Sequence, residues 1–329
     1  MSSTNITRRT ALAGVAATLA TSFASAQAFP SRPIRIVVPF GAGGTGDTVA
    51  RLWGQKMGEL LGQPVIVENR PGAAQLLAIR TVLAAPADGY TLLAPGGSAM
   101  AQLPALRKDL PYDPLKDFSL IGIAVTNPGV VFVSPSLPVR TLSELVAYAK
   151  ANPGKLNYGS AGVGTAGHLG IEALMASTGV KMTHVPYKSD ADVIREVMAG
   201  TVQLSVMTTL NTVQAVKAGR IRAIAVTTAN RLPYLPDVPG LSETRIKGAD
   251  SLEPHTFISL VGPAGMPPAV VARLNEAMNK VSAMPDVVKT VTDTLYAEPV
   301  TTTPASFREF VEKQLVVWRE IGKTVTLTE

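Results

Sequence analysis

Two glycine-rich loops hold the residue types in this chain that are best suited to bind an anion. The first reads "GAGGTGD" at 41–47, directly after the apolar run "IRIVVPF", and the second reads "YGSAGVGTAGHL" at 158–169. Each loop precedes a segment with helical spacing, and the unpaired amides and positive dipole end of a helix N-terminus attract carboxylates. Neither loop contains Lys or Arg, so binding would depend on amides, hydroxyls and bridging waters. Together the loops predict one small carboxylate held from two sides.

The first loop also satisfies the pattern of a dinucleotide-binding fold. Gly41, Gly43 and Gly46 match G-x-G-x-x-G, and Glu68 ends the next strand at about the spacing of a ribose-binding acid. Against this interpretation, the bulky Phe40 stands where the turn must approach the pyrophosphate closely. A nicotinamide-binding oxidoreductase is kept as the alternative, as is a tight turn that binds nothing.

The remaining polar residues predict neither catalysis nor a metal site. The histidines are His168, His184 and His255, and none has the spacing of a metal pair. The serines in "YGSAG" and "GGSAM" lack the flanking glycines of a nucleophile elbow. No acid–base pair stands out, since Glu172 faces the second helix and Asp47 is expected to cap the first. That cap would leave the amides from Gly43 to Gly46 for the ligand.

The elements that position these loops alternate between strands and helices, which predicts α/β lobes with a parallel-rich sheet in each. We expect helices at 48–61, 166–177 and 190–199, and a last helix that starts at Thr303-Pro304 with Trp318 on its inward stripe. Trp53 and Trp318 are both expected in the core. A break at 127–129 between two apolar runs predicts a hinge. Two crossings would join lobe 1, at 29–128 and 254–329, to lobe 2, at 129–253, with the ligand cleft between them.

The N-terminus and the composition predict an exported protein. Residues 1–28 combine Arg8-Arg9 with an acid-free apolar stretch that ends in small residues, as a signal peptide does. Cleavage is expected after Ala28 or Ala26, by the general or the twin-arginine route. The chain has no cysteine, so it relies on core packing and carries no thioether-linked lipid. A formal charge of +6 is scattered without basic runs, which argues against nucleic-acid binding.

Longer motifs resemble the Bug-type receptors, the periplasmic solute-binding components of tripartite tricarboxylate transporters. They are "FPSRPIRIVVPFGAGGTGD", "LGQPVIVENRPGA", "PADGYTLL", "LPYDPLKDF", "YAKANPGKLNYGSAGVGTAGHL", "VPY" plus Lys188, "VKAGRIRAIAVTTANRLPYLPDVPG" and "GPAGMP". The resemblance implies a two-lobe, type II periplasmic-binding-protein fold that closes on a small carboxylate or amide-bearing metabolite. It implies no enzyme activity and no cofactor, a monomer, and permease subunits as partners. A receptor that feeds a sensor kinase is a further alternative.

In the family that the sequence resembles, the two loops bind one end of the ligand, and variable positions contact the other end. The candidates in the loops are Phe40, Gly43, Gly44, Thr45, Gly46, Asp47, Ser160, Gly162, Gly164 and Thr165, and those elsewhere are Gln75, Gly96, Gly97, Ser98, Lys188 and Met207. The sequence departs from the family at "PGAAQLLA" (71–78), at Ser189, where a glycine is usual, and at Met207, where an Asp is frequent. The loss of that charge favours a plain or aromatic acid over an amino acid.

Overall fold

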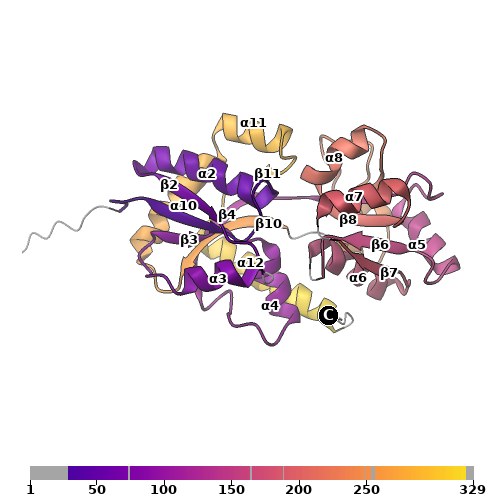
Figure 1. Ribbon diagram of the computed structural model, residues 1–329, viewed down its shortest axis with the longest axis horizontal. Coiled ribbons are helices and arrows are strands. Elements are labelled where there is room, and N and C mark those ends of the chain that lie inside the picture. Colours follow the sequence, from indigo (N-terminus) through magenta and orange to yellow (C-terminus); the bar gives the residue numbers. More distant parts are fainter. Residues whose placement is uncertain are drawn as a thin grey trace, which may run out of the picture.

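The protein, described here by a computed structural model, folds around two β-sheets that lie side by side in two lobes (Figure 1). The structure describes residues 29–323 apart from 73–74, 164, 188, 248 and 253–255. The expected signal peptide at 1–28 lies outside the described residues, as do the candidates Gly164 and Lys188 and the third histidine, His255. The prediction of a two-lobe α/β fold is confirmed.

The first sheet has the strand order β11-β4-β10-β3-β1-β2. Its strands are β1 (Ile34–Val38), β2 (Val65–Asn69), β3 (Thr91–Leu93), β4 (Phe118–Thr126), β10 (Phe257–Pro263) and β11 (Glu298–Pro299). Strand β1 pairs in parallel with both of its neighbours, whereas β10 and β11 pair antiparallel. The first glycine loop therefore leaves the carboxyl end of the strand that is flanked by parallel strands, the usual position of a ligand loop in such sheets.

The second sheet has the order β7-β6-β8-β5-β9. Its strands are β5 (Gly129–Val133), β6 (Asn157–Ser160), β7 (Thr183–Pro186), β8 (Leu204–Thr208) and β9 (Arg222–Val226). Strand β6 is again parallel to both neighbours, and the second glycine loop follows its carboxyl end. The two loops thus have equivalent positions in their sheets.

Helices connect and cover both sheets. The first lobe contains α2 (Thr45–Leu61), α3 (Leu76–Leu83), the π-helical turn η2 (Ser98–Gln102), α4 (Leu103–Leu106), α10 (Pro268–Ser282), α11 (Pro285–Asp293) and α12 (Pro304–Gly322). The second contains α5 (Leu142–Ala151), α6 (Ala166–Thr178), α7 (Asp190–Ala199), α8 (Thr209–Lys217), α9 (Leu241–Thr244) and the 3-10 turn η3 (Ala249–Leu252). Within the described ranges, no helix combines the length and the apolar character that a bilayer crossing requires.

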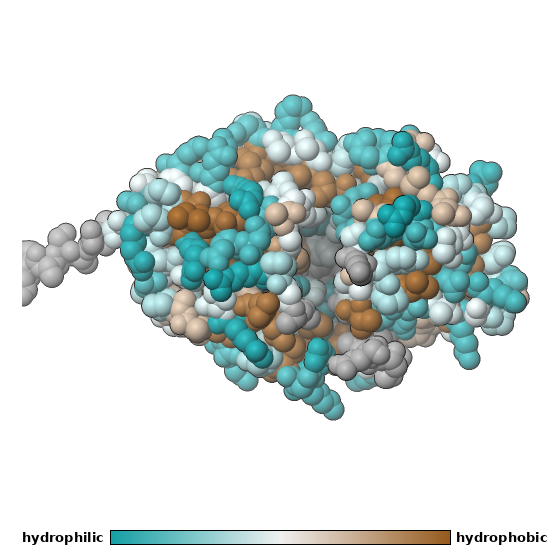
Figure 2. Space-filling view, in the orientation of Figure 1, coloured by the Kyte–Doolittle hydropathy of each residue, from teal (hydrophilic) through white to brown (hydrophobic). Residues whose placement is uncertain are grey.

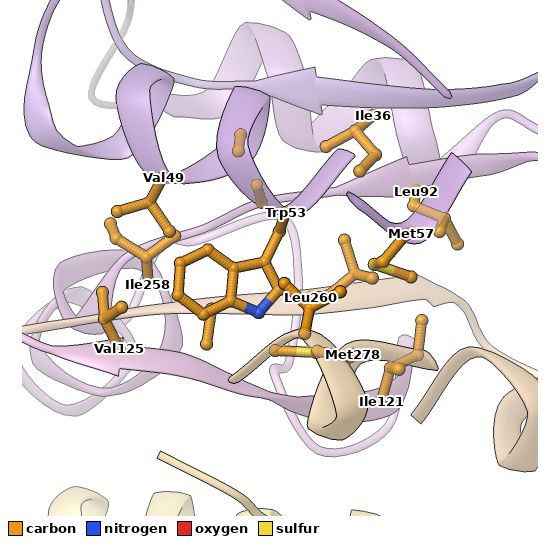
Figure 3. Packing of buried hydrophobic residues seen from close by; sticks show 14 of the residues in the cluster. Ile36, Val49, Trp53, Met57, Leu92, Ile121, Val125, Ile258, Leu260 and Met278 are labelled. Atoms are coloured by element: carbon orange, nitrogen blue, oxygen red, sulfur yellow. The ribbon is translucent and has the colours of Figure 1, made fainter. Parts of the chain in front are cut away.

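The core of the first lobe fixes α2, and with it the first loop. The indole of Trp53 is 3% exposed and packs among Met57, Leu260 of β10 and Met278 of α10 (Figure 3). Burying each such side chain contributes roughly 1.5–3 kcal/mol. Trp318 of α12 is likewise buried, so the prediction that both tryptophans belong to the core is confirmed. The expected cap of α12 is also confirmed, because Thr303 Oγ1 accepts the amide of Ser306 at 3.0 Å.

The chain segments that cross between the lobes lie side by side. Strand β4 ends at Thr126 and β5 begins at Gly129, and the amide of Asn127 donates to the carbonyl of Thr256 at 2.8 Å. The Thr256 hydroxyl donates back to the carbonyl of Asn127. The hinge at 127–129 and the lobe boundaries at 128/129 and 253/254 remain predictions, since residues 253–255 are outside the described chain.

Tyr296 and a small apolar cluster also join the lobes, away from these crossings. The carbonyl of Tyr296, which follows α11, accepts hydrogen bonds from the hydroxyls of Thr209 and Tyr234 in the second lobe. A small apolar cluster unites Leu169 of α6 with Ala101 of η2 and Trp318 of α12. The start of α6 is therefore held against the first lobe by packing.

Candidate functional site

A cavity of about 280 Å³ lies between the two lobes. Figure 2 shows the surface hollowed between the two halves of the molecule. Phe40 lines the cavity from the position directly before the first loop, and Ala161 and Thr165 line it from the second loop. The other lining residues are Gly129, Gly167, Asp190, Val206, Met207, Thr208, Leu252 and Thr256. Phe40 and the second loop therefore contribute to one cavity, whereas residues 41–47 of the first loop are not among its lining residues. The size of the cavity is near the lower end for pockets that bind small molecules.

Phe40 is held between two glycines at the mouth of the first loop. A Cβ atom at Gly46 would lie 2.3 Å from Phe40 Cδ2, and one at Gly96 would lie 3.2 Å from Phe40 Cζ. The carbonyl of Phe40 accepts a hydrogen bond from Asn69 Nδ2 at 3.1 Å. The ring can reach the cavity in this orientation because both neighbours lack a side chain.

The prediction that Asp47 caps α2 is wrong. The helix begins at Thr45 after Gly44, so Asp47 lies inside its first turn. Its Oδ2 accepts the amide of Gly43 at 2.9 Å, because Gly43, at φ +80°, turns that amide back towards the helix. The amide of Gly43 is therefore not available to a ligand. Among the described hydrogen bonds, none uses the amides of Gly44, Thr45 or Gly46, which remain the candidates for an anion.

The carboxylate of Asp47 organises the first loop. Its Oδ1 accepts from Asn69 Nδ2 at 2.8 Å and pairs with Arg51 Nε at 2.9 Å. Burial by itself raises the pKa of Asp47, but the hydrogen bonds from Arg51, Gly43 and Asn69 outweigh it and hold the pKa below its usual value. Asp47 is thus a buried anion that shapes the loop from behind rather than facing the cavity.

The second loop is shaped by Ser160 in a similar way. Ser160 Oγ accepts the amide of Gly162 at 3.2 Å and donates to the carbonyl of Gly162 at 2.9 Å. Gly162 has φ +123°, a conformation that residues with a side chain rarely adopt. The same carbonyl accepts Thr165 Oγ1 at 2.8 Å. The hydroxyls of Ser160 and Thr165 therefore hold the loop in shape, and Thr165 also lines the cavity.

A stack of aromatic rings supports Ser160 from below and was not anticipated from the sequence. His184 Nε2 lies 2.7 Å from Ser160 Oγ, and the ring of His184 stacks on Tyr158 at 4.9 Å and on His168 at 4.1 Å between centroids. Glu172 accepts the Tyr158 hydroxyl. Ser160 is only 1% exposed, so the Ser–His contact positions the loop and does not present a nucleophile. The register of β6 and β7, which pairs Tyr158 with His184, creates this contact.

The stack keeps both histidines neutral. Burial, helped by the neighbouring His168, lowers the pKa of His184 to about 4, and burial also lowers the pKa of His168. Protonation of either ring would place a charge in a partly buried stack. The shape of the second loop therefore depends on both histidines being neutral.

We expect the free energy of unfolding to fall as the pH drops from 6.5 towards 4. His184 stays neutral in the native state down to a pKa of about 4, but in the unfolded chain it binds a proton near about 6.5. Between these two pH values the unfolded state binds more protons than the native state. The contribution of His184 to the free energy of unfolding is therefore fully present above pH 6.5 and is lost as the pH falls towards 4. The loss should be on the order of 1–2 kcal/mol after allowance for partial exposure. Urea titrations of the wild type and of His184→Gln at pH 7.5 and 4.5 measure it; equal losses in the two proteins would contradict the prediction.

The candidates at the variable end are only partly in the cavity. Met207 lies on β8, is 7% exposed and lines the cavity. Gln75 Nε2 donates to Ser98 Oγ at 3.3 Å, but neither residue lines the cavity, and nor do Gly96 and Gly97. Gly97 is buried directly before η2. Gly96 therefore lies against the ring of Phe40, and none of Gln75, Gly96, Gly97 and Ser98 forms part of the cavity surface.

Asp190 is a cavity residue that no motif in the sequence singled out. It begins α7, and Oδ2 accepts a hydrogen bond from Asn211 Nδ2 at 2.6 Å. Burial raises the pKa of Asp190, and the bond from Asn211 only partly opposes this. An acid in the first turn of a helix is so common that its residue type does not indicate a position in the cavity.

Comparisons with known proteins agree with this arrangement. Residues 49–327 match the family model described as tripartite tricarboxylate transporter family receptor. The chain is similar to Rpa4515 of R. palustris, solved with adipate, at 33% identity and a TM-score of 0.80 over 90% of this chain and 98% of that one. It is similar to MatC of Rhodopseudomonas palustris with bound malate, at 29% identity and a TM-score of 0.78 over 89% and 100%. The periplasmic binding protein BugD gives 33% identity and a TM-score of 0.77 over 90% and 98%.

Proposed function

The chain belongs to the tripartite tricarboxylate transporter receptor family, and from this premise we propose that it captures a small carboxylate between its lobes and delivers it to membrane permease subunits. The observation that carries the proposal is that Phe40, directly before the first glycine loop, and Ala161 and Thr165 of the second loop line one cavity. Members of the family are solute-binding receptors, so the chain is a receptor and not an enzyme. The alternative of a nicotinamide-binding oxidoreductase is set aside, because the family consists of receptors.

The export of the receptor is part of the proposal. BugD is a periplasmic binding protein, and the apolar stretch after Arg8-Arg9 supports a signal peptide over 1–28. The mature receptor would be a monomer that starts at Phe29, or at Gln27 if cleavage follows Ala26.

The proposed capture follows from the geometry of the loops. The amides of Gly44, Thr45 and Gly46 would bind the ligand carboxylate together with backbone groups of the second loop, either directly or through water. A ligand that touches both lobes only in the closed form has higher affinity for that form, and this difference would drive closure. Gly164 and Lys188 remain proposed contributors from the second lobe.

We further propose that the ligand is a plain or aromatic acid rather than an amino acid. Met207 gives β8 an uncharged side chain in the cavity wall, where an acidic residue could pair with an ammonium group. Adipate and malate, found with two similar proteins, are acids without an amino group.

A thermal-shift screen followed by calorimetry tests the function. We expect at least one non-amino carboxylate to raise the melting temperature, because a ligand at 100 times its Kd stabilises the native state by about 2.7 kcal/mol. NAD, NADP, aspartate and glutamate are the comparison compounds. Shifts with the nucleotides alone would refute the receptor proposal, and tight binding of aspartate or glutamate would refute only the ligand class.

A further inference from the structure

We infer that Asp190 is a specificity-determining residue that accepts a hydrogen bond from a hydroxyl group of the ligand. The inference rests on the proposed function and adds to it a second functional group, which the ligand must carry besides its carboxylate. Asp190 lines the cavity between the lobes together with Phe40, Thr165 and Met207. It is the one acidic or basic side chain among the described residues that line this cavity.

The carboxylate of Asp190 has capacity left for a ligand. Among the described residues, its hydrogen bond from Asn211 Nδ2 involves Oδ2, at 2.6 Å, which fixes the carboxylate and leaves Oδ1 as an acceptor. The hydrogen bond from Asn211 favours the ionised form of Asp190, and an ionised carboxylate accepts hydrogen bonds and donates none. The group of the ligand that meets Asp190 must therefore be a donor, because a second ligand carboxylate at this place would be repelled.

The surroundings favour a neutral donor over an ammonium group. Val206 and Met207 of β8, the strand beside α7, form apolar parts of the cavity wall. A hydroxyl has one hydrogen to donate and is satisfied by one acceptor, whereas an ammonium group has three. An ammonium group with unsatisfied donors in a partly apolar cavity would cost more free energy to bury than a hydroxyl.

Matched acids test the inference by calorimetry, and the natural ligand need not be identified first. One series is butyrate with its 2-, 3- and 4-hydroxy and amino derivatives, and the other is benzoate with its hydroxy and amino derivatives. A hydrogen bond to a charged group contributes about 1.5–3 kcal/mol, so in at least one series a hydroxy acid should bind the wild type roughly 10- to 100-fold more tightly than its parent.

Variants on the same helix separate this role from a structural one. Asp190→Ala removes the acceptor and should bring the hydroxy acid to within about 3-fold of its parent acid, while the parent itself binds as before. Glu196→Ala is the matched control, since it removes a carboxylate from α7 outside the cavity and should keep the preference. If the alanine variant is unstable, the same comparison of hydroxy and parent acids is made with Asp190→Asn, which retains the size and one acceptor.

Each outcome of this experiment decides one proposal. A hydroxyl preference that Asp190→Ala abolishes and Glu196→Ala retains supports the inference. Equal binding of hydroxy and parent acids by the wild type, or a preference that survives Asp190→Ala, overturns it while leaving the carboxylate receptor intact. Tighter binding of an amino acid than of its hydroxy counterpart also overturns it. If no acid of any kind in the wider screen binds, it is the proposed function that fails.

Discussion

Gly167→Ala is expected to lower the free energy of unfolding by about 2–3 kcal/mol and to abolish ligand-induced stabilisation. A Cβ atom at Gly167 would lie 2.3 Å from the carbonyl oxygen of Val206. That oxygen belongs to the backbone of β8, which pairs with β5 at Val131, so it cannot move as the end of a flexible side chain does. The start of α6 must therefore shift, and the second loop, which leads into it, must shift too.

The same helix supplies a matched control for this variant. A Cβ atom at Gly170 would meet only Leu252 Cδ2, at 3.6 Å, which is an ordinary van der Waals distance. Gly170→Ala should therefore keep the wild-type stability or gain up to about 1 kcal/mol from the higher helix propensity of alanine. Urea unfolding measures both variants, and the carboxylate with the largest wild-type thermal shift is the binding probe. If Gly167→Ala were as stable as Gly170→Ala, the close approach of α6 to β8 would be disproved.

Asp47→Asn is expected to cost about 2–4 kcal/mol of stability and most of the affinity for the same probe. The buried carboxylate accepts hydrogen bonds from the amide of Gly43, Asn69 Nδ2 and Arg51 Nε. An asparagine keeps the shape but has a single oxygen, so its NH2 group would face at least one of these donors. The first loop would then lose the contacts that turn Gly43 back towards α2.

An exposed aspartate controls for the loss of negative charge. Asp286 pairs with Lys56 at 2.7 Å, but its side chain is 61% exposed. Asp286→Asn should change stability by at most about 1 kcal/mol, as is usual for surface ion pairs, and should not affect binding. The measurement is again urea unfolding together with calorimetry. Similar losses in the two variants would mean that the burial of Asp47 and its three partners have no special importance.

The sequence was sufficient for the order of the elements, because each depends on local patterns. Apolar spacing and flanking glycines or prolines placed α7 at its observed bounds, Asp190–Ala199, and the end of α2 at Leu61, before Gly62. The start of α2 was predicted three residues late. Gly44, at the cap position, has no side chain to signal the helix, and Asp47 has the residue type of a cap although it bonds from inside the first turn.

The loops of the candidate site were predictable for the same reason, whereas the contacts that support them were not. The glycine loops are continuous segments whose composition indicates anion binding. Asp47, in the first turn of α2, meets Asn69 because β2 pairs with β1, and Ser160 meets His184 because β7 pairs with β6. Asp190 enters the cavity through the placement of α7 beside β6 and β8, which no local pattern encodes.

The enclosure of Phe40 by two glycines has a consequence for how such a receptor can diversify. Its ring lines the cavity, but its position is set by the absence of side chains at Gly46 and Gly96. A methyl group at either position would press on the ring and change the volume offered to the cargo, although neither glycine lines that cavity. Single substitutions at Gly46 or Gly96, outside the cavity surface, could thus change which ligand is accepted. The rest of the loop backbone proposed to bind the anion would stay unaltered.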